Sequence, residues 1–343
     1  MEEALPNFFS NQTPWALGAM VVGLLAVLGK SADKLVSEAV VLSERSGLPK
    51  VVIGATIVSL GTTSPEAAVS VLAALQSKPD LALGNAVGSI ICDTGLILGI
   101  ACLIDPPKLP SGIVNRQGWL QFGSGVLLVA LSWPKNGDNP WQQGGNFPQW
   151  AGFLCVMLLA VYLWLSVRWA RSSVTEIEDI ENAAAKEFSA PIGLVVAKLL
   201  FAISLVLGSS HFLIPAIEVA ATRMGVPAGI VAATLVAFGT SLPELVTAVT
   251  ASLKGHGDLA VGNVVGADIL NVLFVAGLSA AVTPGGLDAE PYFFQVQFPS
   301  MLVILALFRV GIYFSGDRLK RPIGTLLLVA YAVYLVLNFT LVS

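Results

Sequence analysis

The feature that most limits the fold of this chain is its series of long apolar runs. The run Ile323–Val342 contains no charged residue, and Phe153–Val167 continues without charge up to Arg168. A helix needs about 20 such residues to cross the ~30 Å hydrocarbon core of a bilayer. Charged residues make up only 12% of the chain, whereas a soluble domain carries about a quarter. The pattern predicts an all-α integral membrane protein.

Ten transmembrane helices are expected along the chain, separated by clusters of proline, glycine and charged residues. The Pro106–Pro110, Pro134–Pro148 and Pro284–Pro291 segments mark three of the boundaries. The predicted spans are residues 15–36, 48–76, 80–104, 117–134, 148–169, 191–221, 226–253, 258–282, 292–314 and 321–342.

The distribution of lysine and arginine predicts the orientation, because cytoplasmic loops are enriched in positive charge. With both termini on the non-cytoplasmic side, 15 of the 18 basic residues fall on the cytoplasmic side, and only Lys78, Lys135 and Arg223 fall outside. We expect the first span to be retained, since Met1–Glu3 lacks the basic start of a signal peptide. We also expect the protein to lie in the cell (inner) membrane. Nucleic acid is not an expected partner, because the chain has no basic run.

The chain contains an internal duplication with an offset of 178 residues. The sequence Gly61–Glu66 reads GTTSPE and aligns with GTSLPE at Gly239–Glu244, while Gly84–Gly88 aligns with Gly262–Gly266. The repeated motifs occupy residues 54–100 and 232–278. We therefore divide the chain into a first five-helix repeat (1–170), an acidic cytoplasmic linker (171–190) and a second five-helix repeat (191–343).

The odd number of spans in each repeat has a topological consequence. The second repeat must enter the membrane with the orientation opposite to the first. Inverted repeats are common in secondary transporters, where the substrate site lies near the bilayer midplane between the repeats. The sequence therefore predicts ten helices in two inverted halves, with a site formed by both.

Two glutamates and one aspartate lie inside the repeated apolar spans. Glu66, Glu244 and Asp93 would each cost about 2.5–3.5 kcal/mol at the bilayer centre. Pro65 and Pro243 precede the glutamates, so the second and seventh helices should be broken there. The break should free backbone carbonyls near Ser59 and Ala237. Carboxylate, hydroxyl and carbonyl oxygens are the ligands that Ca²⁺ prefers, and the set lacks the histidine and cysteine typical of zinc, copper or iron sites.

The third and eighth spans carry a second row of polar residues. Asn85, Ser89 and Asp93 follow one another at four-residue intervals, so they share one helix face. Their counterparts in the second repeat are Asn263, Ala267 and Asn271. The paired glycines Gly84 and Gly88, and Gly262 and Gly266, predict close helix packing.

These paired motifs resemble the two α-repeats of the cation/Ca²⁺ exchanger superfamily, which includes the Na⁺/Ca²⁺ exchangers and their prokaryotic relatives. The resemblance is carried by residues 61–93 and 239–271. It implies alternating access at one central cluster, no cofactor apart from the transported ions, and function as a monomer. The implied Ca²⁺ ligands are Glu66, Glu244, Thr62 and Thr240, with the carbonyls of Ser59 and Ala237. The implied Na⁺ or H⁺ sites involve Thr63, Ser89, Asp93, Ser241 and Asn271.

Three positions depart from the pattern of that superfamily. The aspartate usually lies in the second repeat and the asparagine in the first, whereas here Asp93 is in the first and Asn271 in the second. Ala267 stands where a serine hydroxyl would be expected. Asp268 is an additional acid with no assigned role. These departures leave the identity and number of the counter-ions open.

Na⁺/Ca²⁺ antiport is the leading hypothesis, and H⁺/Ca²⁺ antiport is the alternative. Carboxylates close together should not all ionise without a cation, so protons could replace Na⁺. A cation channel fits the paired broken helices less well. Enzymatic activity is not expected: the segment Gly255–Asp258 superficially matches an aspartyl protease motif but falls at a helix junction.

Overall fold

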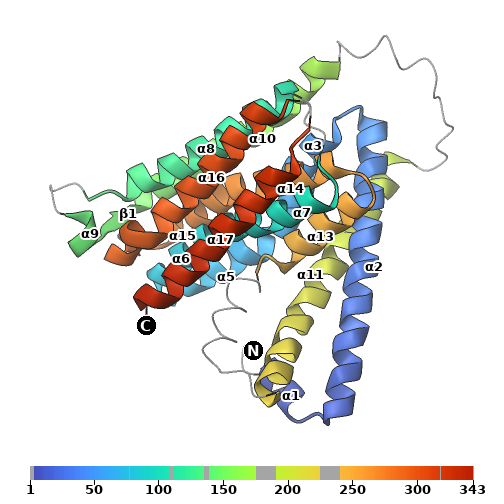
Figure 1. The fold of residues 1–343 in the computed structure, drawn as a ribbon, viewed down its shortest axis with the longest axis horizontal. Coiled ribbons are helices and arrows are strands. Elements are labelled where there is room, and N and C mark those ends of the chain that lie inside the picture. Colours follow the sequence, from blue (N-terminus) through green and yellow to red (C-terminus); the bar gives the residue numbers. More distant parts are fainter. Residues whose placement is uncertain are drawn as a thin grey trace.

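The computed structural model describes residues 4–76, 78–107, 111–134, 139–174, 191–224, 240–316 and 318–342. These residues form a bundle of long helices with one short two-stranded sheet (Figure 1). The first repeat contains α1 (Ala4–Ser10), α2 (Pro14–Ser46), α3 (Lys50–Ile53), η1 (Gly54–Val58), α4 (Ser59–Thr62), α5 (Ser64–Leu75), α6 (Pro79–Cys92), η2 (Asp93–Ile97), α7 (Leu98–Ile104), α8 (Ser111–Ser132), α9 (Pro140–Gln143), β1 (Gly145–Phe147) and α10 (Gln149–Val174). The second contains α11 (Ile192–Arg223), α13 (Leu242–Leu253), α14 (Gly257–Leu270), η4 (Asn271–Ala276), α15 (Gly277–Val282), β2 (Leu287–Ala289), η5 (Phe293–Gln297), α16 (Phe298–Ser315) and α17 (Arg321–Val342).

The described residues confirm that the chain is mostly helical and contains membrane-spanning helices. Seven helices are long and apolar enough to cross a membrane, or eight if the bent pair Lys50–Thr62 and Ser64–Leu75 counts as one span. The predicted fourth span corresponds to α8, which is not among the seven helices that are long and apolar enough. The first half of the predicted seventh span lies outside the described residues. The described helices therefore do not by themselves establish a count of ten.

The predicted break in the second helix is present as a 42° bend between α4 and α5. Pro65 is in the first turn of α5, where a proline is tolerated because the first amide groups of a helix have no intrahelical acceptor. The second repeat begins α13 in the same way, with Pro243 in the first turn. The glutamate that follows each proline is thereby placed at a helix N-terminus.

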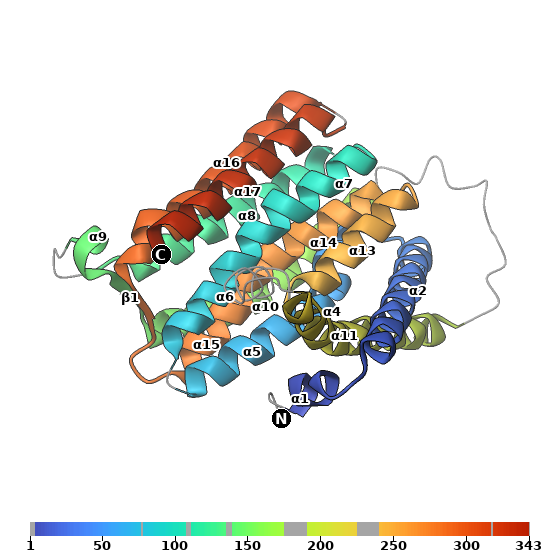
Figure 2. The ribbon, with the colours of Figure 1, turned by 60° about the horizontal axis from the view of Figure 1, so that its bottom comes forward.

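The two central helical segments of the bundle are α6–η2–α7 and α14–η4–α15. Their most apolar windows are 72% and 89% buried inside the protein, against 22–44% for the other continuous spans. The packing is reciprocal between the repeats: α5 packs on η4 and α15, and α13 packs on η2 and α7. Figure 2 shows α5 beside α15, and α13 beside α14. The repeat symmetry seen in the sequence is therefore also a symmetry of packing.

The glycines predicted to allow close packing behave differently in the two repeats. A Cβ on Gly262 would lie 2.2 Å from the carbonyl oxygen of Val51, and one on Gly266 would lie 2.5 Å from Ala55 Cα. In the first repeat, a Cβ on Gly84 would meet Phe293 at an ordinary 3.8 Å, and Gly88 has no described atom within 4 Å. Gly84 and Gly88 instead line a cavity.

Contacts between loops link segments that the predicted topology places on the same side. Strand β1 pairs antiparallel with β2, joining two loops that are expected outside. Arg223 donates hydrogen bonds to the carbonyls of Ser10 and Gln12 on the same predicted side. On the predicted inner side, Lys254 forms an ion pair with Asp33 at 2.6 Å.

The longest helices, α2 and α11, lie side by side at one edge of the bundle. They run in a different direction from α6, α8, α16 and α17 (Figure 1). Both contact α13, so this pair flanks the helix that carries Glu244.

Candidate cation site

The site is centred on two glutamates, each at the start of a helix. Glu66 is in the first turn of α5 and Glu244 in the first turn of α13. Both are buried, with exposed fractions of 1% and 0%. The unpaired amide groups and the dipole of a helix N-terminus favour negative charge there. The proline-glutamate pair therefore places each carboxylate where the backbone partly compensates its burial.

The two repeats are joined through a hydrogen bond to one of these glutamates. Thr63 Oγ1 donates to Glu244 Oε1 at 3.2 Å, and Glu66 is close enough to both Glu244 and Asp93 for their charges to interact. The second carboxylate oxygen of each glutamate is buried without a hydrogen-bond partner. Two unsatisfied acceptors in an apolar interior are costly unless a cation binds them.

A pair of equivalent contacts links threonine in one repeat to asparagine in the other. Thr62 Oγ1 lies 3.5 Å from Asn263 Oδ1, and Thr240 Oγ1 lies 3.2 Å from Asn85 Oδ1. Because both residues of the second pair follow from the first by the 178-residue offset, these contacts repeat across the molecular pseudo-symmetry. Asn85 and Asn263 thus contact the segments that precede α13 and α5.

Asp93 and Asn271 occupy matching positions in the two repeats, and both are 1% exposed. Each is the first residue of a π-helical segment, η2 or η4, and such segments are frequent at functional sites. All four terminal atoms of the two side chains are buried without hydrogen-bond partners. Ser241 Oγ, directly before α13, is likewise buried without a hydrogen-bond partner.

The remaining predicted residues lie around this centre. Ser89 is buried on α6. The Ser59 carbonyl accepts a hydrogen bond from the amide of Thr63 at 2.8 Å, so the helix break does not leave it free as expected. Ala237 lies outside the described residues. Ala267 is buried on α14 and brings no hydroxyl group to the cluster.

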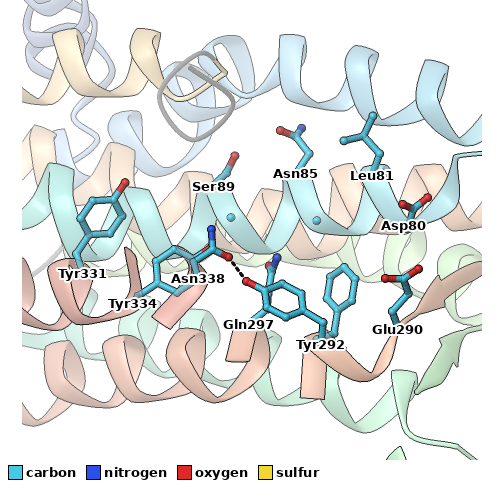
Figure 3. A pocket seen from close by; sticks show the side chains of 13 residues that line it. Asp80, Leu81, Asn85, Ser89, Glu290, Tyr292, Gln297, Tyr331, Tyr334 and Asn338 are labelled. Carbon is cyan, nitrogen blue, oxygen red and sulfur yellow. Dashed lines mark hydrogen bonds between the residues drawn. The ribbon is translucent and has the colours of Figure 1, made fainter. Parts of the chain in front are cut away.

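Two cavities meet the site. The larger, about 460 Å³, extends from Asp80 and Glu290 to Asn85 and Ser89, between α6, η5 and α17 (Figure 3). Tyr331 and Tyr334 form part of its wall. The second, about 340 Å³, is lined by Pro65, Asn85, Thr240 and Pro243. These prolines directly precede the two glutamates in the sequence, so the second cavity lies against the first turns of α5 and α13.

Sequence reasoning did not find two polar residues of this interior. Thr94 lies in η2 and Gln121 in α8, and both hydrogen-bond to Asp268. The available signal was a buried glutamine inside an apolar span. Gln121 is on α8, which lies outside the repeated motifs.

The oxygen atoms of this site suit a hard cation that prefers oxygen ligands. Among the described residues, no three His, Cys, Asp or Glu side chains come together closely enough to enclose a metal ion on their own. A cation bound here would also need the neighbouring hydroxyl and amide oxygens. Such mixed oxygen ligands are typical of Ca²⁺ rather than of the softer transition metals.

Fold and site together define an α-helical integral membrane protein in which two sequence repeats contribute equivalent polar side chains to one buried cluster. Residues 15–168 and 194–340 match the family described as sodium/calcium exchanger protein. The chain belongs to this family, which confirms the resemblance found in its motifs.

Individual relatives agree with this assignment. The chain is 32% identical over 329 residues to the inner membrane protein YrbG of Escherichia coli, covering 95% of this chain and 97% of YrbG. It is 29% identical over 348 residues to the sodium/calcium exchanger MaX1 of Methanosarcina acetivorans, covering 92% and 96%. Its fold matches the sodium-calcium exchanger NCX_Mj with a TM-score of 0.77 at 21% identity, over 94% of this chain and 99% of NCX_Mj.

Proposed function

We propose that this protein is a secondary antiporter that exchanges Ca²⁺ for Na⁺ across a membrane by alternating access. The observation that carries the proposal is the pair Glu66 and Glu244. Both are buried, one comes from each repeat, and each retains a carboxylate oxygen without a partner. A Ca²⁺ ion between them would offset two negative charges and satisfy acceptors that the protein leaves open.

In this proposal Thr62, Thr63 and Thr240 act mainly by positioning other side chains of the site. Thr63 orients Glu244, and the other two threonines hold Asn263 and Asn85 against the broken helices. Asp93, Ser89, Ser241 and Asn271 would supply the oxygens of the Na⁺ sites. Coupling follows from competition, because Ca²⁺ and Na⁺ cannot occupy the same carboxylates together.

The proposed topology is ten transmembrane helices in two inverted repeats, with both termini on the non-cytoplasmic side of the cell (inner) membrane. The loop contacts support it, because β1 with β2 and Lys254 with Asp33 each join segments assigned to one side. The name of the Escherichia coli relative agrees with an inner-membrane location. Since both repeats lie in one chain, we expect a monomer to suffice.

H⁺/Ca²⁺ antiport is the second candidate, and the number of buried acids favours it. Glu66, Glu244, Asp93 and Asp268 are all at most 1% exposed, and four such acids would cost about 10–14 kcal/mol on insertion scales if unpaired. Ca²⁺ offsets two charges, so the rest must be offset by Na⁺ or by protons.

Reconstitution in sealed vesicles tests the proposal. We expect an outward Na⁺ gradient to drive ⁴⁵Ca²⁺ uptake, and Glu66→Gln and Glu244→Gln to abolish it. Glu290→Gln serves as the matched control, because this acid lines the outer end of the large cavity, away from the glutamate pair. Uptake driven by a pH gradient alone would assign protons as the counter-ion. Equilibration that needs neither gradient would indicate a channel.

A further inference from the structure

The hydrogen bonds of Asn85 connect the site to a serine outside the residues assigned to it. Ser70 is on α5, one helical turn after Glu66, and it is fully buried. The amide nitrogen of Asn85, Nδ2, donates to Ser70 Oγ at 2.9 Å and to the backbone carbonyl oxygen of Glu66 at 3.5 Å. Both acceptors are on α5, so this helix holds the donor end of the amide group.

These contacts fix which end of the Asn85 amide faces the second repeat. If the amide were reversed, Oδ1 would lie against the carbonyl oxygen of Glu66, and two acceptors would meet. With Nδ2 held by α5, Oδ1 accepts the hydrogen of Thr240 Oγ1 at 3.2 Å. A hydroxyl group has one hydrogen to donate and two lone pairs to accept with. Because Asn85 takes the hydrogen of Thr240, both lone pairs of that hydroxyl stay available to a cation.

The second repeat provides an internal comparison, because it lacks this serine. The 178-residue offset pairs Ser70 with Ala248, which has no hydroxyl group. The equivalent amide, that of Asn263, is fully buried, and its Nδ2 has no hydrogen-bond partner. Its Oδ1 lies 3.5 Å from Thr62 Oγ1, against 3.2 Å for the equivalent contact in the first repeat. Where the serine is missing, the donor end of the amide is unsupported and the threonine contact is longer.

We propose that Ser70 is a positioning residue for Ca²⁺ binding. It fixes the amide of Asn85, and Asn85 takes the hydrogen of the Thr240 hydroxyl, which leaves that oxygen free to bind the ion. Hydrogen-bond partners that orient metal ligands in this way contribute to metal affinity without touching the metal. The inference rests on the proposed Na⁺/Ca²⁺ exchange and adds to it a residue that acts through two others.

Uptake of ⁴⁵Ca²⁺ by vesicles containing Ser70→Ala tests this role. We expect the half-maximal Ca²⁺ concentration to rise about tenfold, the lower end of the range for lost partners of metal ligands. The maximal rate should stay within about twofold of wild type, because the change removes binding rather than a transport step. Ser204→Ala is the matched control, since this exposed hydroxyl donates to the Leu200 carbonyl of its own helix, α11.

A conservative variant separates the hydroxyl group from the packing of the side chain. Ser70→Thr keeps the acceptor oxygen and should restore the half-maximal Ca²⁺ concentration of wild type. Ser70 lines the second cavity, so we expect the added methyl group to be accommodated.

A double variant shows whether Ser70 acts through Thr240. Thr240→Val removes the hydroxyl group and should itself raise the half-maximal Ca²⁺ concentration. Adding Ser70→Ala should then raise it no further, because residues that act through one hydrogen-bond network are not additive. Increases that add fully would overturn the inference, since the serine would then act independently of the threonine.

Ca²⁺ binding in detergent keeps the test independent of transport. Ca²⁺ should raise the unfolding temperature of the wild-type protein, and Ser70→Ala should need about tenfold more Ca²⁺ for the same rise. Comparing each variant with and without Ca²⁺ separates this effect from a loss of stability. If Ser70→Ala does not fold, Ser70→Cys decides the question by the same measurement, because the cysteine sulfur is close in size but a weak acceptor.

The possible outcomes separate the inference from the function on which it rests. Wild-type vesicles without Na⁺-driven uptake would refute the proposed exchange, while Ca²⁺-dependent stabilisation would still decide the role of Ser70. Normal exchange with an unchanged Ca²⁺ response in Ser70→Ala would overturn the inference. A lower maximal rate with an unchanged half-maximal Ca²⁺ concentration would also overturn it, in favour of a role in helix packing.

Discussion

Adding a single methyl group at equivalent glycines of the two repeats should have unequal effects. Gly84 and Gly262 are related by the 178-residue offset, so the sequence treats them alike. In the structure, a Cβ on Gly262 would lie 2.2 Å from Val51 O and 2.8 Å from Val51 C, both backbone atoms. A Cβ on Gly84 would lie 3.8 Å from Phe293 Cζ, an ordinary van der Waals distance.

The expected size of the effect follows from this geometry. Relieving the contact in Gly262→Ala requires α14 to move away from α3 by about 1 Å, since backbone atoms cannot rotate aside as side chains do. Overpacking of this kind costs about 1–3 kcal/mol, and we expect the upper end of that range. With an unfolding entropy of about 2.1 cal/mol/K per residue, this lowers the unfolding temperature by about 4 °C.

The assay is thermal unfolding of the purified variants in detergent, followed by ⁴⁵Ca²⁺ uptake. Gly84→Ala should unfold within about 1 °C of wild type, because its methyl group fits the existing space. Gly262→Ala should also transport less, because moving α14 separates Asn263 from Thr62, which are already 3.5 Å apart. Equal destabilisation by the two variants would refute the reasoning, since the asymmetry of packing would then not be real.

Two further predictions concern single interactions. Thr63→Val removes the hydrogen bond to Glu244 at 3.2 Å. A hydrogen bond to a charged group contributes about 1.5–3 kcal/mol, so the half-maximal Ca²⁺ concentration for uptake should rise about ten- to a hundredfold, and Thr63→Ser should restore it; an unchanged value would show that Thr63 does not orient Glu244. Partial burial and the nearby Lys50 lower the pKa of His256, outside the membrane spans. The folded protein therefore disfavours the charged histidine, and stability should be constant above the ordinary pKa of about 6.5 and fall at lower pH. His256→Gln should reduce this fall in the unfolding temperature between about pH 7.5 and 5, and an identical pH profile would exclude His256 as its source.

Much of the candidate site could be predicted from the repeat. Because the motifs occur twice at one offset, Thr62 and Asn263 had to correspond to Thr240 and Asn85, and the structure brings both pairs into contact. The bend in the second predicted span was predictable as well, since a proline inside an apolar span is tolerated mainly in the first turn of a helix.

Other parts of the site could not be predicted, because they depend on which faces meet. The π-helical turns that begin at Asp93 and Asn271 have no simple sequence signal. Gln121 lies outside both motifs, and its contact with Asp268 depends on how α8 packs against α14. The carbonyl of Ser59 was expected to be free, but the helix stays hydrogen-bonded through Thr63.

The sequence by itself determined that the chain lies in a membrane, that its two halves are repeats, and that acids from both halves belong to its apolar interior. These properties follow from the hydropathy and the identity of the residues, which the sequence alone provides. Only the tertiary structure decided that Gly262 packs against backbone while Gly84 lines a cavity, and that Asp268 accepts hydrogen bonds from Thr94 and Gln121. Repeated sequence makes two halves chemically alike, but distances between helices depend on the whole packed bundle, which need not be symmetric.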